Sequence, residues 1–301
     1  MSFSQAIKDD LCRLELNERE QALELATALL LNARFYANEL SLATSHLAFS
    51  ERLRQDFNDV LGLQTDLSEG RELYTLRLEG RDALEAVGAF LEETLSFDTF
   101  HGRFQGQGSE FSDEDERSIL RFMYLAGGSV SDPTRSYHLE LACRRLQVAK
   151  FCIRLMSSQG IHASLIKRYG SNVVYLKDGQ QISDYLGIIG AHLSLLQFES
   201  LRVEKDMRNN VNRMVNCDTA NAQRIANTAF RQLEALHWYE ENIGLDKLPD
   251  DLLAAAGARL EYPELSLAEL GALLDPPLGK SGMNHRLKKL EAIIDQSRKD
   301  A

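Results

Sequence analysis

Two similar stretches, separated by an offset of 95 residues, constrain the fold of this chain more than any other feature. Residues 25–35 read LATALLLNARF, and residues 120–130 read LRFMYLAGGSV. Each stretch is an apolar run of helical periodicity that leads directly into a strand-like segment. A repeat of this kind predicts two copies of one α/β unit, related by a pseudo-twofold axis.

The predicted elements follow one order in both copies: helix, two strands, helix, two strands, helix. In the first copy, helical periodicity covers residues 18–31, about 51–61 and 81–94, and alternating stretches cover 34–48 and 72–79. In the second copy, Ser112 is a predicted N-cap, since the acidic residues at 113–116 suit the positive end of a helix dipole. Gly127-Gly128 ends that helix, and a strand at 137–142, a helix at 144–158, a hairpin turning at Gly170-Ser171 and a helix near 181–189 follow.

The last third of the chain is predicted to be helical. Its asparagine-rich part favours a helix break near residues 216–218, with Asp218 or Thr219 capping a helix that runs to about Tyr239. The predicted fold class is therefore α+β: a pseudo-twofold domain of two αββαββα units, then an all-α domain. The predicted boundaries are 1–100 for the first repeat, 101–112 for a Gly-rich linker, 113–200 for the second repeat, 201–217 for an interdomain linker and 218–301 for the helical domain.

The C-terminal residues have the pattern of a helix-turn-helix. Leu267, Leu270 and Leu274 form one apolar stripe after a Ser266 N-cap, and the sequence DPPLG breaks the chain before a second helix. A short helix, a tight turn and a basic second helix form the arrangement that places its second helix in the DNA major groove, although a plain helical hairpin has a similar pattern. The residues assigned to DNA binding are Ser266, Leu267, Glu269, Leu270, Lys280, Ser281, Asn284, His285, Arg286, Lys288 and Lys289. Of these, Ser281, Asn284 and Arg286 suit base edges, and the lysines suit phosphates.

Charge is distributed unevenly along the chain. The formal net charge is −11, but residues 1–120 carry −13 and residues 121–301 carry +2. Residues 141–170 contain six basic side chains and no acid, which indicates either a solvated helix face or a local anion-binding surface. Backbone or interdomain contacts are assigned to Arg144, Arg145, Lys167, Arg168, Arg208, Asn209, Asn212, Arg213 and Asn216. The alternative for residues 208–216 is a connecting helix with a polar surface and no binding role.

The helix-end motifs resemble those of the LAGLIDADG homing endonucleases, in which two such helices deliver acidic metal ligands to DNA. On that pattern Asn32 and Gly127 stand at the acid positions, so neither copy supplies a carboxylate. Cleavage of a phosphodiester with Mg²⁺ needs anionic oxygen ligands, which neither residue offers. The resemblance therefore implies a scaffold that binds DNA without cutting it, with no catalytic residue, no metal and no cofactor.

The whole chain resembles the WhiA family, in which a degenerate LAGLIDADG domain precedes a helix-turn-helix domain similar to region four of a sigma factor. The stretches that carry the resemblance are MSFSQAIKDDLCR, LAGGSVSDPTRSYHLEL, NRMVNCDTANAQR and SLAELGALLDPPLGKSGMNHRLKKL. The first copy departs from the motif at Ala33, where the family has glycine. The resemblance implies a role in cell division, chromosome segregation or transcription, double-stranded DNA as the partner, and RNA polymerase, a sigma factor or another regulator as further partners.

Other features bound the function classes. The four cysteines form no CxxC pair, and no apolar run approaches the ~18 residues that span a bilayer, so we expect a reduced, cytoplasmic, nucleoid-associated chain without a membrane partner. Two alternatives to a DNA-binding regulator stay open. One is a protein-interaction adaptor, favoured by the acidic first part, and the other is a residual nuclease using His138 and Glu140, which alternate onto one strand face.

Overall fold

The computed structural model describes residues 2–71, 73–105, 111–168 and 170–300, arranged in two compact units, Met1–Asp206 and Met207–Ala301. The central part of the linker predicted at 101–112 lies outside the described residues. Its first part contains β6 (Arg103–Phe104), which pairs with β5 (Phe97–Asp98). No helix in these described ranges is both long and apolar enough to cross a membrane.

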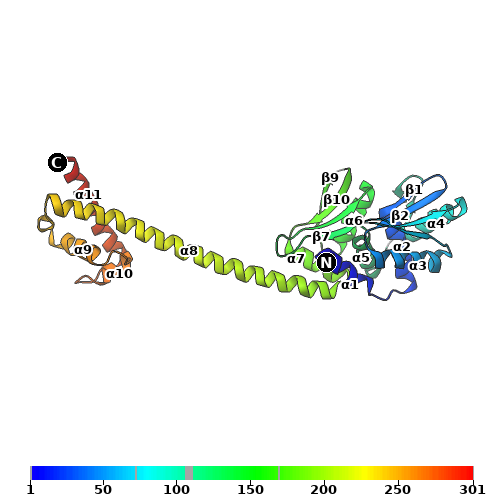
Figure 1. The fold of residues 1–301 in the computed structure, drawn as a ribbon, viewed down its shortest axis with the longest axis horizontal. Helices are drawn as coiled ribbons and strands as arrows, with labels where there is room; N and C mark the ends of the chain where they lie inside the picture. Colours follow the sequence, from blue (N-terminus) through cyan, green and yellow to red (C-terminus); the bar gives the residue numbers. More distant parts are fainter. Residues whose placement is uncertain (1, 72, 106–110, 169, 301) are drawn as a thin grey trace. The chain divides into compact units, whose positions relative to one another are not determined.

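Unit 1 contains the two predicted repeats (Figure 1). After α1 (Phe3–Cys12), the first repeat consists of α2 (Glu18–Asn32), β1 (Ala33–Phe35), β2 (Glu39–Thr44), α3 (Leu47–Leu61), β3 (Asp66–Glu69), β4 (Tyr74–Glu79) and α4 (Arg81–Leu95). The second consists of α5 (Asp113–Gly127), β7 (Gly128–Val130), β8 (Leu139–Cys143), α6 (Leu146–Ser158), β9 (Ser164–Arg168), β10 (Ser171–Leu176) and α7 (Gly179–Ile188). The predicted order of elements is confirmed in both copies.

The two copies share one sheet topology. The strand orders are β1-β2-β4-β3 and β7-β8-β10-β9, and all the pairs are antiparallel. The offset of 95 residues relates both ends of α2 to those of α5, and both ends of β1 to those of β7. The repeat read from the sequence is therefore a structural repeat, and the predicted α+β fold class is correct.

Helices α2 and α5 pack against each other at the centre of unit 1 (Figure 1). Every residue of α2 from Leu23 to Leu31 is buried, and α5 buries the equivalent run from Ser118 to Ala126 except for Arg121. A helix that is apolar nearly all round must be covered on all sides, which a neighbouring helix, flanking helices and a sheet provide here.

Capping side chains fix where these two helices begin. Asn17 and Glu20 form a reciprocal capping box at the start of α2, and the Ser112 side chain accepts a hydrogen bond from the backbone N–H of Asp115 at the start of α5. The acidic run at 113–116 occupies the first turn of α5, as predicted.

Some predicted boundaries differ from the structure. The stretch at 34–48 contains two strands, β1 and β2, and β3 has no counterpart among the stretches named from the sequence. The strand predicted at 137–142 begins later, as β8, because residues 132–136 form a turn held by Asp132, whose side chain accepts hydrogen bonds from the backbone and hydroxyl of Thr134.

The helix break predicted near residues 216–218 is wrong. One helix, α8 (His192–Asn242), runs through this region, so Asp218 and Thr219 lie in a helix interior and the linker at 201–217 is helical. All side chains from Met207 to Gln223 are exposed, and two asparagines there bond to side chains one turn away. Asn210 Oδ1 accepts from Arg213 Nη2 at 2.5 Å, and Asn221 Nδ2 donates to Cys217 Sγ at 3.8 Å. An asparagine that is satisfied in this way no longer competes for backbone groups, and its residual helix penalty of about 0.7 kcal/mol or less is small.

Unit 2 consists of the second part of α8 with a 3-10 turn (Leu245–Lys247), α9 (Asp250–Glu261), α10 (Leu267–Ala272) and α11 (Lys280–Asp300). Its core is separate from that of unit 1 and includes Leu236, Leu252, Leu270, Met283, Leu287, Leu290 and Ile294. Of the stripe predicted for the first helix, Leu270 and Leu274 are core residues, and Leu267 packs against the core while partly buried. The turn itself is tight, because a Cβ at Gly271 would lie 2.2 Å from the Leu278 carbonyl oxygen.

Candidate nucleic-acid interfaces

The two positions that the LAGLIDADG resemblance assigns to catalytic acids lie at the paired ends of α2 and α5. The Asn32 side-chain amide donates to the Ala126 carbonyl oxygen at 2.7 Å and to the Ala43 carbonyl oxygen at 3.3 Å. Asn32 therefore ties the end of one central helix to the end of the other. A carboxylate at this position could not make either bond, because it has no hydrogen to donate.

The second position has no room for a side chain. A Cβ built on Gly127 would lie 2.9 Å from the Ala142 carbonyl oxygen and 3.4 Å from Leu31 Cδ2. The first of these contacts is to backbone, which cannot move aside as a flexible side chain can. Gly127 thus permits close packing between α5, β8 and α2, and this packing leaves no space for a metal-binding carboxylate.

A basic pocket of about 550 Å³ lies beside the end of α2. Its lining includes Arg34, Arg144 and Arg145, with the aromatic residues Phe35 and Tyr36, and Tyr36 is 53% exposed. Burial and the neighbouring Arg144 lower the pKa of Arg145, whose guanidinium lies 5.3 Å from the centre of the Phe97 ring. Arginine remains charged at neutral pH, so the pocket presents concentrated positive charge beside exposed rings, a combination suited to nucleic acid.

This pocket joins residues predicted from the sequence with others that were missed. Arg144 and Arg145 were assigned to backbone contacts because of the acid-free run at 141–170. Arg34, Phe35 and Tyr36 were not, since they sit within an acidic stretch of the chain. Only the packing of the two repeats brings β1 next to the end of β8.

The solvent-facing surface of the second sheet has its charges partly paired. Glu140 Oε1 accepts hydrogen bonds from His138 Nε2 at 2.6 Å and from Arg168 Nη1 at 3.1 Å. Arg168 is therefore in an ion pair, whereas Lys167, the other predicted contact on β9, is exposed. Among the residues that the structure describes, no group of three or more His, Cys, Asp or Glu side chains could hold a metal ion.

The corresponding surface of the first sheet is more acidic. The strand register places Glu39 opposite Glu79, and Arg77 opposite Asp66 on one side and Ser41 on the other. The two sheets thus share a topology but not a charge. The basic side chains of unit 1 that gather at the pocket beside α2 come from the second repeat and from Arg34.

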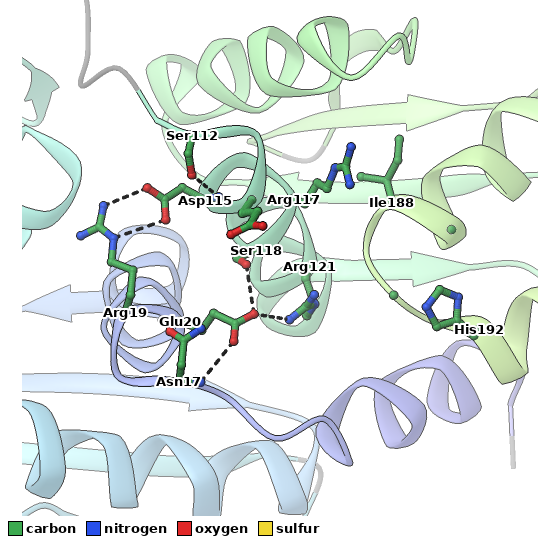
Figure 2. Close-up of a pocket in the computed structure, with 13 residues that line it drawn as sticks. Asn17, Arg19, Glu20, Ser112, Asp115, Arg117, Ser118, Arg121, Ile188 and His192 are labelled. Atoms are coloured by element: carbon green, nitrogen blue, oxygen red, sulfur yellow. Dashed lines mark hydrogen bonds and ion pairs between the residues drawn. The ribbon is translucent and has the colours of Figure 1, made fainter.

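A further pocket of about 620 Å³ lies at the N-terminal ends of the two central helices (Figure 2). Two ion pairs cross it: Arg19 bonds Asp115 across the two repeats at 3.2 Å, and Arg121 bonds Glu20 at 3.0 Å. These bonds hold α2 and α5 together, so the pocket is a helix–helix junction with balanced charge.

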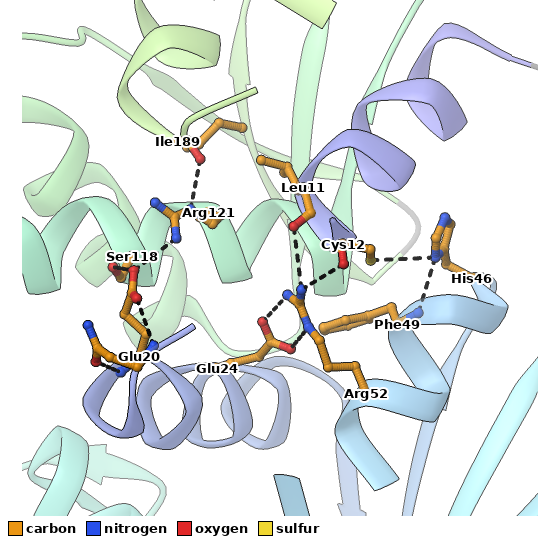
Figure 3. Close-up of polar contacts among 11 residues, drawn as sticks. Leu11, Cys12, Glu20, Glu24, His46, Phe49, Arg52, Ser118, Arg121 and Ile189 are labelled. Atoms are coloured by element: carbon orange, nitrogen blue, oxygen red, sulfur yellow. Dashed lines mark hydrogen bonds and ion pairs between the residues drawn. The ribbon is translucent and has the colours of Figure 1, made fainter. Parts of the chain in front are cut away.

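Figure 3 shows a polar cluster that joins α1, α2 and α3. Arg52 forms a two-pronged ion pair with the fully buried Glu24 and donates to the Leu11 and Cys12 carbonyl oxygens at 3.4 and 3.2 Å. Burial, with the nearby Glu24 carboxyl, raises the pKa of Asp56 to about 8. The cluster anchors the N-terminal helix onto the first repeat.

In unit 2, α10 and α11 form the predicted helix-turn-helix. Ser266 and Glu269 make a reciprocal capping box at the start of α10, which occupies both side chains in a structural role, and Leu270 is buried. On α11, Lys280, Ser281, His285, Lys288 and Lys289 are exposed, and Asn284 and Arg286 are half-buried. Helical spacing places Ser281, His285 and Lys288 on the face opposite Met283 and Leu287, with Asn284 and Arg286 on its two flanks.

Residues 208–216, assigned to backbone or interdomain contacts, lie on α8 with all their side chains exposed. Arg208, Asn209, Asn212 and Asn216 are free to meet a partner, and Arg213 bonds Asn210 on its own helix. Asn and Arg side chains on an exposed helix are suited to phosphates and sugars.

Comparison with known proteins matches both units. Residues 116–208 match the WhiA LAGLIDADG-like domain model, and residues 211–294 match the WhiA C-terminal HTH domain model. The probable cell division protein WhiA of Ruminiclostridium cellulolyticum is 37% identical over 100% of this chain and 99% of its own length. The chain belongs to the WhiA family.

Two further WhiA proteins support this assignment. The probable cell division protein WhiA of Clostridium botulinum is 37% identical, covering 98% of both chains. The crystal structure of full-length DUF199/WhiA from Thermotoga maritima is 26% identical, with a TM-score of 0.58 over 98% of this chain and 99% of that one. The resemblance drawn from the sequence is confirmed, as are the LAGLIDADG-like fold and the helix-turn-helix.

Proposed function

We propose that this protein is a non-enzymatic, DNA-binding regulator. The observation that carries the proposal is the helix-turn-helix of unit 2, in which an apolar core holds α10 and α11 and the outer face of α11 presents Ser281, His285 and Lys288 to solvent. A basic helix held in this way fits the major groove, where its first turns reach base edges. The basic pocket of unit 1 and the exposed Arg and Asn side chains of α8 add sequence-independent phosphate contacts.

The absence of nuclease activity belongs to the same proposal. The two positions aligned with catalytic acids carry Asn32, whose amide bonds two carbonyl oxygens, and Gly127, where a Cβ would crowd the backbone. Glu140 is engaged by His138 and Arg168. Without carboxylates at the helix ends, the scaffold lacks the anionic ligands that Mg²⁺-assisted cleavage needs.

We place this activity in the cytoplasm, at the nucleoid, in cell division, chromosome segregation or transcriptional control. The names of the relatives support the first of these roles. RNA polymerase, a sigma factor or another regulator is the proposed protein partner, because a helix-turn-helix in a regulator acts by placing such a partner at a DNA site.

A protein-interaction adaptor with weak DNA contact is the second candidate. The net charge of −13 over residues 1–120, together with the acidic pairs on the first sheet, favours a protein over DNA as the partner of the first repeat. Recovery of the same protein partners from nuclease-treated and untreated lysates, by a variant with no DNA affinity, would support this candidate.

The deciding experiment measures retention of genomic DNA fragments by the full chain across a salt series, with and without Mg²⁺, and scores strand breaks. The regulator proposal expects salt-sensitive retention of selected fragments without breaks, with a slope that reports the number of phosphates contacted. Absence of retention at low salt contradicts DNA binding. Mg²⁺-dependent breaks that disappear in the Glu140→Gln variant contradict the non-enzymatic assignment.

A further inference from the structure

A pocket of about 460 Å³ lies within unit 2, between α8, the end of α9 and the first residues of α10 and α11. Its lining includes three cationic side chains, Arg224, Arg259 and Lys280, and no acidic residue. Arg224 comes from α8, Arg259 from α9, and Lys280 is the first residue of α11. Three separate elements thus bring positive charge to one place.

Arg259 is the unusual member of this group, because it is 1% exposed and lacks a carboxylate partner. The ion pairs among the described residues of unit 2 join only His237 to Glu240 and Lys247 to Asp246. One end of the guanidinium, Nη1, donates to the carbonyl oxygens of Pro263 and Leu265 at 3.2 and 2.9 Å. The Nε atom is buried and has no hydrogen-bond partner.

A buried cation in this state is costly, because the protein removes it from water without supplying a counter-charge. The burial also lowers the pKa of Arg259, which reports the same cost. Arg224 and Lys280 are exposed at the mouth of the pocket and add like charge that raises the cost further. Thr228 and Ser266 place hydroxyl groups in the same lining.

We propose that this pocket binds a phosphate group, and that the group is a backbone phosphate of the DNA held by α11. The proposal rests on the proposed function and adds α9, together with Arg224 of α8, to the DNA-binding surface. A tetrahedral oxyanion accepts several hydrogen bonds at once, and a guanidinium is the side chain best suited to supply two of them in a fixed fork.

The location favours DNA over a free anion as the source of the phosphate. In a helix-turn-helix the first helix crosses the DNA backbone while the second enters the groove with its N-terminal residues foremost. The pocket is lined by the beginnings of both helices, α10 at Ser266 and Leu267 and α11 at Lys280. A strand whose bases meet Ser281 therefore passes its phosphates beside this pocket.

The test compares the double variant Arg224→Gln/Lys280→Gln with the wild-type chain. Both side chains are exposed, so their removal leaves the fold intact, and Lys247→Gln/Lys299→Gln removes the same charge at exposed positions outside the pocket and outside the residues assigned to DNA binding. The double variant should bind specific and non-specific duplexes more weakly by the same factor, and its log K against log salt slope should fall by about 0.9 for the phosphate lost. The control variant should keep the contact between the pocket and its phosphate. A duplex in which that phosphate is neutralised shows whether the contact is present.

Ethylation or methylphosphonate substitution at successive phosphates supplies this readout. Neutralising the one phosphate that the pocket holds should lower the DNA affinity of the wild type and of the control variant. It should not lower the DNA affinity of the double variant. If every neutralised phosphate weakens the double variant as much as the wild type, the assignment to a backbone phosphate is overturned.

Titration with inorganic phosphate in the absence of DNA, monitored by ³¹P NMR, tests whether the pocket binds a free anion instead. Saturable binding that the double variant loses, with an unchanged salt slope on DNA, would show a free-anion site and overturn the DNA assignment. A wild-type chain that binds no DNA contradicts the proposed function itself, and the phosphate titration then still decides whether the pocket is an anion site. If an Arg259→Lys variant matches the wild type both in DNA binding and in the phosphate titration, the role of the guanidinium fork is contradicted.

Discussion

Asn32 has a structural role at a position that the LAGLIDADG resemblance assigns to a metal ligand. Its amide donates to carbonyl oxygens on two other elements, so the position now depends on an N–H donor where a metal site would need an anion. Gly127 serves the same junction in a different way, since its missing side chain allows the Ala142 backbone to approach. Both residues stabilise the junction of the repeats, and an acid at either position acts against the packing.

Asn32→Asp should therefore destabilise unit 1. At pH 7 the carboxylate loses both hydrogen bonds and places negative charge beside two carbonyl oxygens, so the free energy of unfolding should fall by about 1–3 kcal/mol. The loss should shrink near pH 4, where a protonated aspartic acid can donate again. Urea unfolding at both pH values checks this, and Asn38→Asp, at an exposed position, is the control. Equal stability of the Asn32→Asp and Asn38→Asp variants at pH 7 would contradict the structural role.

Asp56 gives unit 1 a pH-dependent stability. Its pKa in the folded chain is about 8, compared with about 3.9 for an unfolded aspartate. Folding therefore takes up a proton between these values, so this contribution to stability is complete below about pH 4 and is lost as the pH rises through about 8.

Replacement of Asp56 by asparagine removes this term, because the amide does not ionise. The Asp56→Asn variant should be more stable than the wild type at pH 8, by at least about 1 kcal/mol, and the difference should narrow toward pH 5. Denaturant unfolding at pH 5, 6.5 and 8 measures it. A difference that stays constant over this range would mean that the folded carboxyl titrates normally.

At the scale of the element, α8 is a helix whose middle part lacks tertiary support. Residues 207–223 are exposed on every face, so they rely on helix propensity and on local contacts such as that between Arg213 and Asn210. Helical segments of this kind open locally at little cost.

Hydrogen exchange should report this difference within one continuous helix. Amides of residues 207–223 should exchange much faster than those near Phe198 and Leu236, which are buried in the cores of units 1 and 2. Mass spectrometry of overlapping peptides measures the rates. Uniform protection along all of α8 would point instead to a partner that covers its middle part.

The recognition helix also carries a prediction at this scale. Arg286 was assigned to a base edge from its residue type, yet it lies on a flank of α11, half-buried, while His285 and Lys288 occupy the outer face. If Arg286 reads a base, Arg286→Ala should cost about 1–3 kcal/mol of binding free energy on the specific site and relax its sequence preference.

Lys288→Ala is the matched comparison for Arg286→Ala, since it should weaken all sequences alike and lower the salt slope. Both variants are measured by equilibrium titration on specific and non-specific duplexes. Unchanged affinity and specificity of Arg286→Ala, with a loss in Asn284→Ala, would move base recognition to the other flank of the helix.

For the whole molecule, the two separate cores predict two unfolding events. Neither core shares a buried residue with the other, and the helix between them is exposed in its middle part. Calorimetry should show two transitions, one for each unit, and the assumption of a single two-state transition should fail.

Leu287→Ala tests this independence. The side chain is buried in the core of unit 2, so its truncation should lower the stability of that unit by about 2–5 kcal/mol and leave the other transition in place. Leu141→Ala in the core of unit 1 is the reciprocal change. If either substitution moves both transitions together, the units are coupled more strongly than their cores indicate.

The sequence by itself determined the features that depend on neighbours along the chain. The period of apolar residues, the Ser112 and Ser266 caps and the 95-residue offset are local patterns, and they predicted both repeats and the helix-turn-helix. The same local rules failed at residues 216–218, where the chain stays helical although asparagine disfavours a helix interior. Only tertiary structure decided which charges meet: it brings Arg34 to Arg144, pairs Arg168 with Glu140, and buries Arg259 beside Arg224 and Lys280. Such contacts join residues far apart in sequence, and their free energy depends on burial and on the presence of a counter-charge, which no local pattern encodes.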